Sequence, residues 1–256
     1  MKKYFFKMLS IFLLIFALIP TQYISAEHCY WYVKRNSEHK QPLLDTNLSF
    51  IEEYGGVYVD KRYAKNSEEK VIYLTFDVGY ENGNVTKILD AMKQEGVVGS
   101  FFILENVIKR EGDLVLRMAN EGHSVCNHTS NHPDLVGKSQ EKCESEIKGL
   151  EDAYRELTGK ELSKFFRPPE GSFDAQLLQR VQNMGYKTVF WSFAYADWDN
   201  SAQMGEDVAL KKIMDNIHNG EIMLLHPTSA TNAKIMPRLI KELKAQGYRF
   251  ATLEEL

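Results

Sequence analysis

Short runs of apolar and β-branched residues recur along the chain from residue 71 onward, separated by longer stretches with helical spacing of apolar residues. We interpret these runs as strands; they cover residues 71–76, 97–103, 123–127, 164–167, 187–192, 221–225 and 248–252. Strands that alternate with helices pair in parallel through right-handed crossovers. The pattern therefore predicts an α/β protein with seven strands, either a barrel of reduced strand number or an open doubly wound sheet.

Three of the intervening stretches have the pattern of amphipathic helices. Residues 138–158 carry one apolar stripe, with steps of three and four residues between its members. Residues 83–95 and 234–246 show the same spacing, and each is followed by a glycine, Gly96 and Gly247, that can end a helix. We see no internal repeat and no linker to a second domain.

The first 26 residues differ from the rest of the chain. They hold three lysines, no acidic residue and an apolar run of about 11 residues, which is too short to cross a bilayer comfortably. Small residues at 25–26 complete the pattern of a signal peptide cleaved near Ala26, with an uncleaved membrane anchor as the alternative. We therefore expect a signal peptide over 1–26, an irregular extension over 27–70 and the main domain over 71–256. The protein would act outside the cytoplasm, without a stable membrane span after cleavage.

Composition and charge narrow the class of protein. A chain of 256 residues that is 44% hydrophobic and 26% charged is neither disordered, collagen-like nor a polytopic membrane protein. Without residues 1–26, 28 basic residues face 35 acidic ones, so the formal net charge of −4 becomes −7. Because the chain also has no block of five Lys or Arg, we exclude nucleic acid as a partner. Three cysteines are too few for a disulfide framework, so the fold must depend on its core.

Reactive side chains lie at or just after the carboxyl ends of the predicted strands. In both parallel architectures this edge is where active sites are assembled. Residues that are far apart in the sequence are therefore expected to meet there. They are Asp77, His128, His132, Arg167, Asp197, Trp198 and His226.

The spacing of His128 and His132 points to a metal. Two imidazoles four residues apart lie on one side of a turn, and with water they suit Zn²⁺ or a similar cation. Pro133 would stiffen the loop that carries them. Taken alone, the pair is equally compatible with two ordinary polar histidines.

Five stretches of the sequence, in order, resemble the motifs of the NodB-homology polysaccharide deacetylases, also called carbohydrate esterase family 4. They are Thr75-Phe-Asp-Val-Gly79, His128-Thr-Ser-Asn-His-Pro133, Arg167-Pro-Pro-Glu-Gly171, Asp197-Trp198 and Leu224-Leu-His226. The likeness runs from about residue 71 to the end of the chain. It implies a distorted (β/α)7 barrel and metal-dependent hydrolysis of the N-acetyl group of an amino sugar.

A narrower likeness extends over nearly the whole mature chain. Residues 30–36, 54–58, 79–83, 191–198 and 224–227 resemble the PdaA-type branch of the family. That resemblance implies an N-acetylmuramic acid deacetylase that contributes to the muramic δ-lactam of spore cortex peptidoglycan. The implied partner is a glycan strand whose stem peptides an amidase has removed, and we expect a monomer.

The family resemblance also implies a role for each matching residue. Asp77 corresponds to the catalytic base, His226 to the acid, and Arg167 to the residue that orients the base. His128 and His132 correspond to ligands of a divalent metal, for which zinc is the favoured identity. The residues assigned to substrate binding are Trp198, Leu224, Asp197 and Tyr80, with core packing as the alternative for Trp198.

Two positions depart from the family pattern. Val78 stands where the family usually has an aspartate that binds the metal, and Ala194 stands where many members have an aspartate that tunes the acid histidine. Losing an anionic ligand should weaken metal binding, so we expect a weakly held metal and tighter binding with Val78→Asp. Two alternatives stay open: deacetylation of N-acetylglucosamine in peptidoglycan or chitooligosaccharide, and an inactive glycan-binding homologue because of Val78.

Overall fold

A computed structural model describes residues 27–35, 37–64 and 67–256. Seven strands of this described part form one sheet in the order β7-β5-β4-β3-β2-β8, and β9 pairs with the first residues of β2. Every pairing in the sheet is parallel. The strands are β2 (Lys70–Val78), β3 (Ser100–Ile103), β4 (Ser124–Asn127), β5 (Ser163–Phe166), β7 (Lys187–Thr188), β8 (Glu221–Leu225) and β9 (Tyr248–Phe250). The sheet curls into a barrel-like shape, which confirms the predicted distorted (β/α)7 fold and excludes the open sheet.

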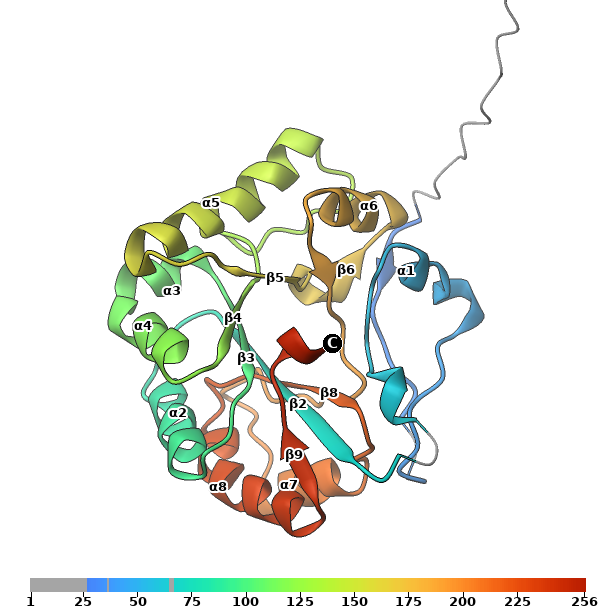
Figure 1. Cartoon of the computed structure of the whole chain (residues 1–256), viewed down its shortest axis with the longest axis vertical. Helices are drawn as coiled ribbons and strands as arrows, with labels where there is room; N and C mark the ends of the chain where they lie inside the picture. The colour runs from blue at the N-terminus through green and yellow to red at the C-terminus, as the bar shows by residue number, and fades with distance from the viewer. Residues whose placement is uncertain (1–26, 36, 65–66) are drawn as a thin grey trace, which may run out of the picture.

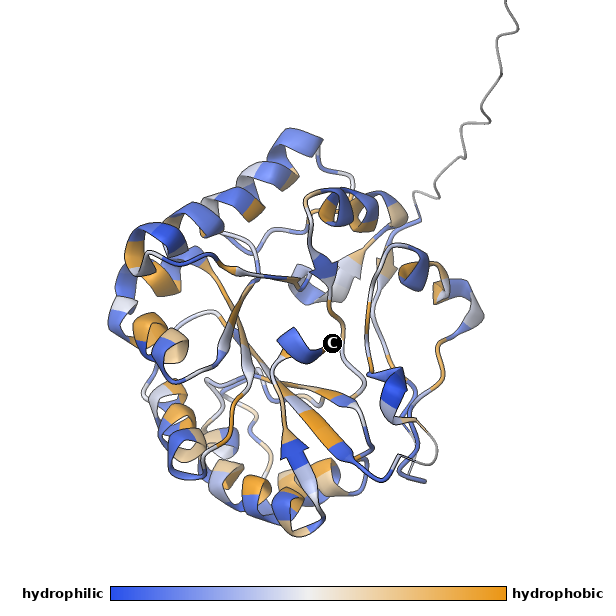
Figure 2. Cartoon of the chain, viewed as in Figure 1, coloured by the Kyte–Doolittle hydropathy of each residue, from blue (hydrophilic) through white to orange (hydrophobic). Residues whose placement is uncertain are grey.

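Helices surround the sheet and turn their apolar sides toward it (Figures 1 and 2). They are α1 (Phe50–Glu53), α2 (Asn84–Gln94), α3 (Glu105–Arg110), α4 (Gly112–Asn120), α5 (Gln140–Thr158), α6 (Ala175–Asn183), α7 (Glu206–Met214) and α8 (Ala230–Ala245). The predicted helices over 83–95 and 138–158 correspond to α2 and α5. The helix predicted over 234–246 corresponds to α8, which begins four residues earlier than predicted. Ser229 caps α8 there, because its hydroxyl accepts a hydrogen bond from the Asn232 amide.

The described residues between 27 and 70 pack against the barrel and pair with it. Val57 pairs with Val189 beyond the end of β7, and Val59 pairs with Glu221 of β8, so this segment bridges the two edge strands of the sheet. The Val57 amide donates to the Thr188 carbonyl over 2.9 Å. Strand β1 (Cys29–Tyr30) pairs antiparallel with β6 (Ser172–Phe173). The strand predicted over 187–192 is shorter than expected, since its second half pairs only at isolated bridges.

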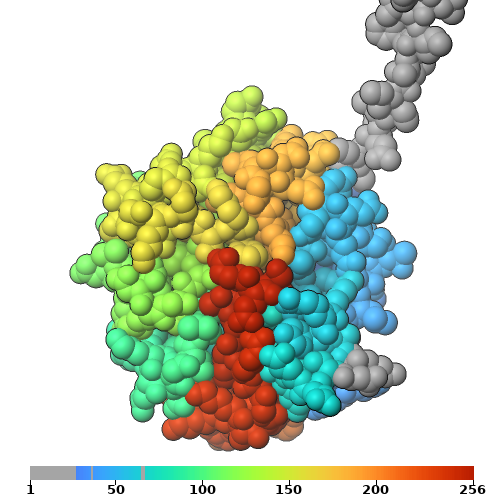
Figure 3. Space-filling view, viewed as in Figure 1, coloured from blue at the N-terminus to red at the C-terminus, as the bar shows by residue number. Residues whose placement is uncertain are grey.

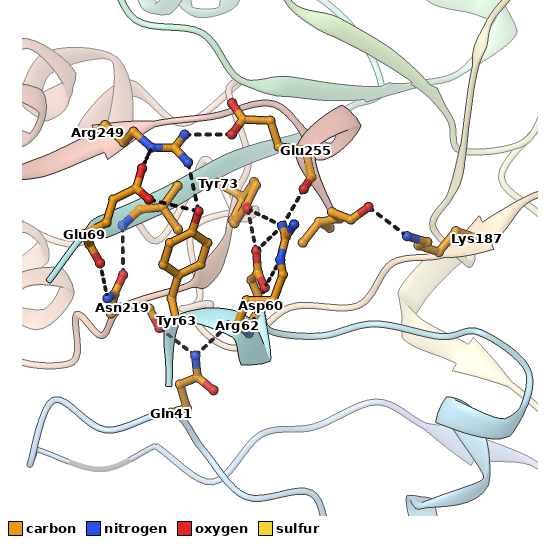
Figure 4. Close-up of polar contacts among 12 residues, drawn as sticks. Gln41, Asp60, Arg62, Tyr63, Glu69, Tyr73, Lys187, Asn219, Arg249 and Glu255 are labelled. Atoms are coloured by element: carbon orange, nitrogen blue, oxygen red, sulfur yellow. Dashed lines mark hydrogen bonds and ion pairs between the residues drawn. The ribbon is translucent and has the colours of Figure 1, made fainter. Parts of the chain in front are cut away.

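The face turned toward the viewer in Figures 1 and 3 is the amino-terminal end of the barrel. The last residues of the chain cover it, and Leu253 packs there with Val71 and Tyr73 from the start of β2. A polar network surrounds this end: Tyr73 and Arg62 both donate to Asp60 (Figure 4). Reactive groups at the carboxyl ends of the strands therefore lie on the opposite face.

No helix among the described residues is long and apolar enough to cross a membrane. The signal peptide expected over residues 1–26 lies outside the described residues.

Candidate active site

A buried ion pair forms the base of the site. Arg167 directly follows β5 and has no exposed surface, and its Nη1 donates to Oδ1 of Asp77, near the end of β2, over 2.8 Å. The same guanidinium donates to Thr75 Oγ1 and to the carbonyls of Val189 and Phe190. These contacts hold the guanidinium plane fixed, so Asp77 meets a positive charge of defined position.

The electrostatic surroundings keep Asp77 ionised. Burial raises the pKa of this carboxyl, but the charge of Arg167 and the smaller effects of His128 and His226 outweigh burial and lower the pKa overall. Asp77 can therefore accept a proton at neutral pH while staying fixed at the cavity wall.

His128 and His132 lie close to Asp77. Their rings are 4.9 Å apart between centroids and stand edge to face, and His128 Nε2 lies 3.7 Å from Asp77 Oδ2. The other ring nitrogen of His128, Nδ1, lies 2.8 Å from the Arg167 carbonyl, which can only accept, so Nδ1 carries the proton. Burial lowers the pKa of His128 to about 4, so its ring is neutral and Nε2 has a free lone pair.

The loop that presents these histidines is conformationally strained. Thr129 and His132 both have positive φ angles, 74° and 58°, which are rare for residues with a side chain. The Thr129 hydroxyl accepts a hydrogen bond from the His132 amide over 2.8 Å, and this contact holds the turn. Strain of this kind is typical of functional sites, where surrounding contacts maintain a costly geometry.

A second acid–base pair lies on the other side of the site. His226 directly follows β8, and its Nδ1 lies 2.7 Å from Oδ1 of Asp197, whose side chain is fully buried. Burial lowers the pKa of His226, but the hydrogen bond and charge of Asp197, with a contribution from Asp77, raise the pKa above its usual value. This shift favours the protonated imidazole, so His226 is able to donate a proton from the cavity wall.

These groups open onto one cavity of about 580 Å³. Its wall includes seven of the nine predicted site residues: Asp77, Tyr80, His128, His132, Trp198, Leu224 and His226. Arg167 and Asp197 lie behind the wall, where each contacts a residue that reaches it. Asp197, which we expected among the substrate-binding residues, therefore meets His226 rather than the cavity.

The remaining wall combines aromatic and apolar surface. Trp198 is 61% exposed, which argues against the core-packing alternative, and its ring stands edge to face with that of His226 at 6.2 Å. Tyr80 is also exposed, and its hydroxyl accepts a hydrogen bond from Asn200. Such surfaces suit a sugar ring. Leu224 is buried at the wall and offers an apolar contact for a methyl group.

Sequence reasoning did not single out several other wall residues: Leu104, Glu170, Trp191, Tyr195 and Thr228. Gly171 illustrates why the wall there is tight. Its φ is +66°, and a Cβ on this residue would lie 2.9 Å from the Trp191 ring. Gly79 and Gly171 also line the cavity. They belong to the first and third motifs, but the sequence of those motifs does not indicate that the glycines face the cavity.

The chemistry of the histidines fits a divalent metal held by two imidazoles. His128 has its Nδ1 proton bound by a carbonyl, the usual arrangement behind a metal-binding imidazole, and His132 lies beside it. No group of three or more His, Cys, Asp or Glu side chains within the described ranges is arranged as a metal cage. Val78 is fully buried in the hydrophobic core and is not part of the cavity wall.

Comparisons with known proteins identify the family to which the chain belongs. Residues 64–189 match the model of the polysaccharide deacetylase family. The chain is 39% identical over 227 residues to the peptidoglycan-N-acetylmuramic acid deacetylase PdaA of Bacillus subtilis, covering 88% of this chain and 84% of that protein. It is 34% identical over 199 residues to a peptidoglycan-N-acetylglucosamine deacetylase of Bacillus cereus, covering 74% and 89%.

The solved structure of Bacillus subtilis PdaA, described as a family 4 carbohydrate esterase, is similar throughout. The TM-score is 0.86 at 38% identity, over 91% of this chain and 98% of that one. The protein therefore belongs to the polysaccharide deacetylases of carbohydrate esterase family 4, a family of metal-dependent deacetylases. It is a hydrolase that removes N-acetyl groups from a polysaccharide.

Proposed function

We propose that this protein hydrolyses the N-acetyl group of N-acetylmuramic acid in peptidoglycan. The observation that carries the proposal is the pairing of Asp77 with Arg167 and of His226 with Asp197 around one cavity beside two histidines. The similarity to the Bacillus subtilis muramic acid deacetylase supports the choice of sugar. Formation of the δ-lactam of spore cortex would follow from that choice, with export from the cell and action as a monomer.

In the proposed reaction, Asp77 removes a proton from the attacking water. The water oxygen bonds to the acetyl carbon, the carbon–nitrogen bond breaks, and His226 gives its Nε2 proton to the departing sugar nitrogen. Its Nδ1 stays bound to Asp197 throughout. The products are acetate and the free amine, so atoms and protons balance.

His128 and His132 would hold the divalent metal, for which zinc is our proposal because imidazole ligands suit it. A metal bound there polarises the acetyl carbonyl and acidifies water. The exposed rings of Trp198 and Tyr80 would contact the sugar, and Leu224 would contact the acetyl methyl group.

One feature of the wall bears on the substrate. The described residues that line it include no lysine and no arginine, so they offer no fixed cation for the lactyl carboxylate of muramic acid. In this proposal the protonated His226 would attract it, together with the charge of a metal held by His128 and His132. Stem peptides, which would occupy that carboxylate, should then prevent the reaction.

Mass spectrometry of glycan strands tests the proposal. Strands with and without stem peptides are incubated with metal-loaded protein, and acetyl loss is assigned to each sugar. We expect loss on muramic acid in peptide-free strands only, and no loss with Asp77→Asn, which keeps the shape of the side chain. Loss on glucosamine would instead support the second candidate, which the similarity to the Bacillus cereus enzyme favours. No acetate release at any metal concentration would support the inactive homologue.

A further inference from the structure

The carboxylate of Asp197 is held in a single orientation by three donors. Oδ1 accepts from His226 Nδ1 over 2.7 Å, while Oδ2 accepts from the His226 backbone amide over 2.8 Å. The third donor is Nδ2 of Asn232, which lies 2.6 Å from Oδ2. Because Asn232 binds the oxygen that the imidazole does not use, it directs the other oxygen toward His226.

Asn232 is itself fixed by its position in α8. It is the third residue of the helix, and its backbone amide donates to the Ser229 cap over 3.1 Å. Its side chain is fully buried, and Nδ2 also donates to the His226 carbonyl over 3.1 Å. The amide group therefore contacts both the carboxylate and the backbone of the residue that the carboxylate orients.

Tyr195 determines which way round the Asn232 amide lies. Its hydroxyl donates to Oδ1 of Asn232, so Nδ2 must face Asp197. Burial, together with the charge of Asp197, raises the pKa of Tyr195, so the phenol keeps its proton and remains a donor. The tyrosine is buried with its ring at the cavity wall.

We propose that Asn232 and Tyr195 are positioning residues for His226, which they orient through Asp197. This inference rests on the proposed acid role of His226, but it concerns the orientation of the imidazole and holds for either sugar. The charged groups that act on His226 are Asp197, Asp77 and Arg167, and none of them is altered by changes at Asn232 or Tyr195.

Two variants separate positioning from simple packing. Tyr195→Phe keeps the ring but removes the donor, so the Asn232 amide can turn its oxygen toward Asp197. Asn232→Leu keeps the approximate size and removes the contact with Asp197. Two control variants make the same substitutions at the other end of the barrel (Figure 4). Tyr73→Phe removes a hydroxyl that is bonded to Asp60, and Asn219→Leu removes the side chain that accepts from the Val71 amide.

Each variant is measured by histidine-ring NMR and by acetate release as a function of pH. We expect kcat to fall about tenfold in Tyr195→Phe and about a hundredfold in Asn232→Leu, with KM nearly unchanged. The alkaline limb of the profile and the pKa of His226 should both move to lower pH, by about one unit. The controls should leave kcat and the profile as in the wild type.

Unchanged pH–rate profiles would overturn the proposal. A shift of the alkaline limb to higher pH would overturn it as well, because Asn232 would then act only by dispersing the charge of Asp197. If Asn232→Leu fails to fold, Tyr195→Phe alone decides. The NMR titration needs no substrate, so a chain that releases no acetate would refute the proposed function without affecting this result.

Discussion

A buried guanidinium is unfavourable unless its N–H groups find acceptors. Arg167 meets this condition through Asp77, Thr75 and two backbone carbonyls, and its Cζ lies over the Phe102 ring, 4.1 Å from the ring centroid. The residue thus combines two functions: it completes the packing of the barrel interior and keeps Asp77 ionised. A lysine has the charge but lacks the planar set of donors.

We therefore expect Arg167→Lys to lower kcat by roughly a hundredfold, which is within the range for a misplaced general base. It should also destabilise the fold by about 3 kcal/mol, because buried acceptors lose their donors. Lysine keeps the charge but loses the fixed hydrogen bond to Asp77, so the pKa of Asp77 should rise only slightly, and the acidic limb of the pH–rate profile should move slightly to higher pH.

Rate profiles and urea unfolding measure both effects, with Arg155→Lys as the control because its ion pairs with Glu161 and Asp152 are exposed. An acidic limb that stays unchanged in Arg167→Met, which removes the charge as well, would contradict the assignment of Arg167 as the group that maintains the charge on Asp77.

At this scale the sequence predicted which polar side chains meet at the cavity, with Arg167 behind Asp77, but it did not indicate Asn232 and Tyr195, which we propose as positioning residues. Asp77, His128 and His226 follow apolar runs, so periodicity alone brought them to one edge. Asn232 lies in the first turn of a helix and Tyr195 in an irregular segment, where no pattern distinguishes a positioning residue from an ordinary polar one. Their roles depend on hydrogen bonds between residues that are far apart in the sequence: Asn232 is 35 positions from Asp197 and 37 positions from Tyr195.

At the scale of elements, apolar runs predicted the parallel strands because strands buried on both faces are continuously hydrophobic. The same rule could not predict that residues 57–59 lie between β7 and β8 and pair with both edges of the sheet. Val57 and Val59 form single bridges, and no apolar run is needed for them. The residues before the main domain therefore looked irregular in sequence, although they contribute to the wall of the barrel.

This closure can be tested at Val57, whose amide donates to the Thr188 carbonyl and whose carbonyl accepts from the Phe190 amide. Val57→Pro removes the donor, whereas Val57→Ala retains it. We expect the proline variant to be less stable than the alanine variant by about 1–3 kcal/mol, the cost of a buried carbonyl that loses its partner. Urea unfolding measures the difference; equal midpoints would show that the segment does not close the barrel.

At the scale of the whole molecule, the two ends of the barrel have separate tasks. One end carries the cavity, and the other is closed by the carboxyl-terminal residues and the polar network around Asp60 (Figure 4). Between them, apolar side chains form three buried clusters. A core of this extent should fold without a metal, so the metal adds stability only through binding to the finished site.

Removing the metal should therefore abolish acetate release and leave the protein folded. A mild chelator should suffice, because two imidazoles and no aspartate at position 78 make a weak site. Adding zinc back to about 100 times its Kd should stabilise the fold by about 2.7 kcal/mol, which raises Tm by roughly 5–10 °C for a domain of this size. The shift should disappear in His132→Ala and persist in His39→Ala, whose ring contacts the Ile217 carbonyl instead. Calorimetry with and without zinc provides the measurement. A chain that unfolds on chelation, or a zinc shift that survives in His132→Ala, would contradict a metal held by this histidine pair on a preformed barrel.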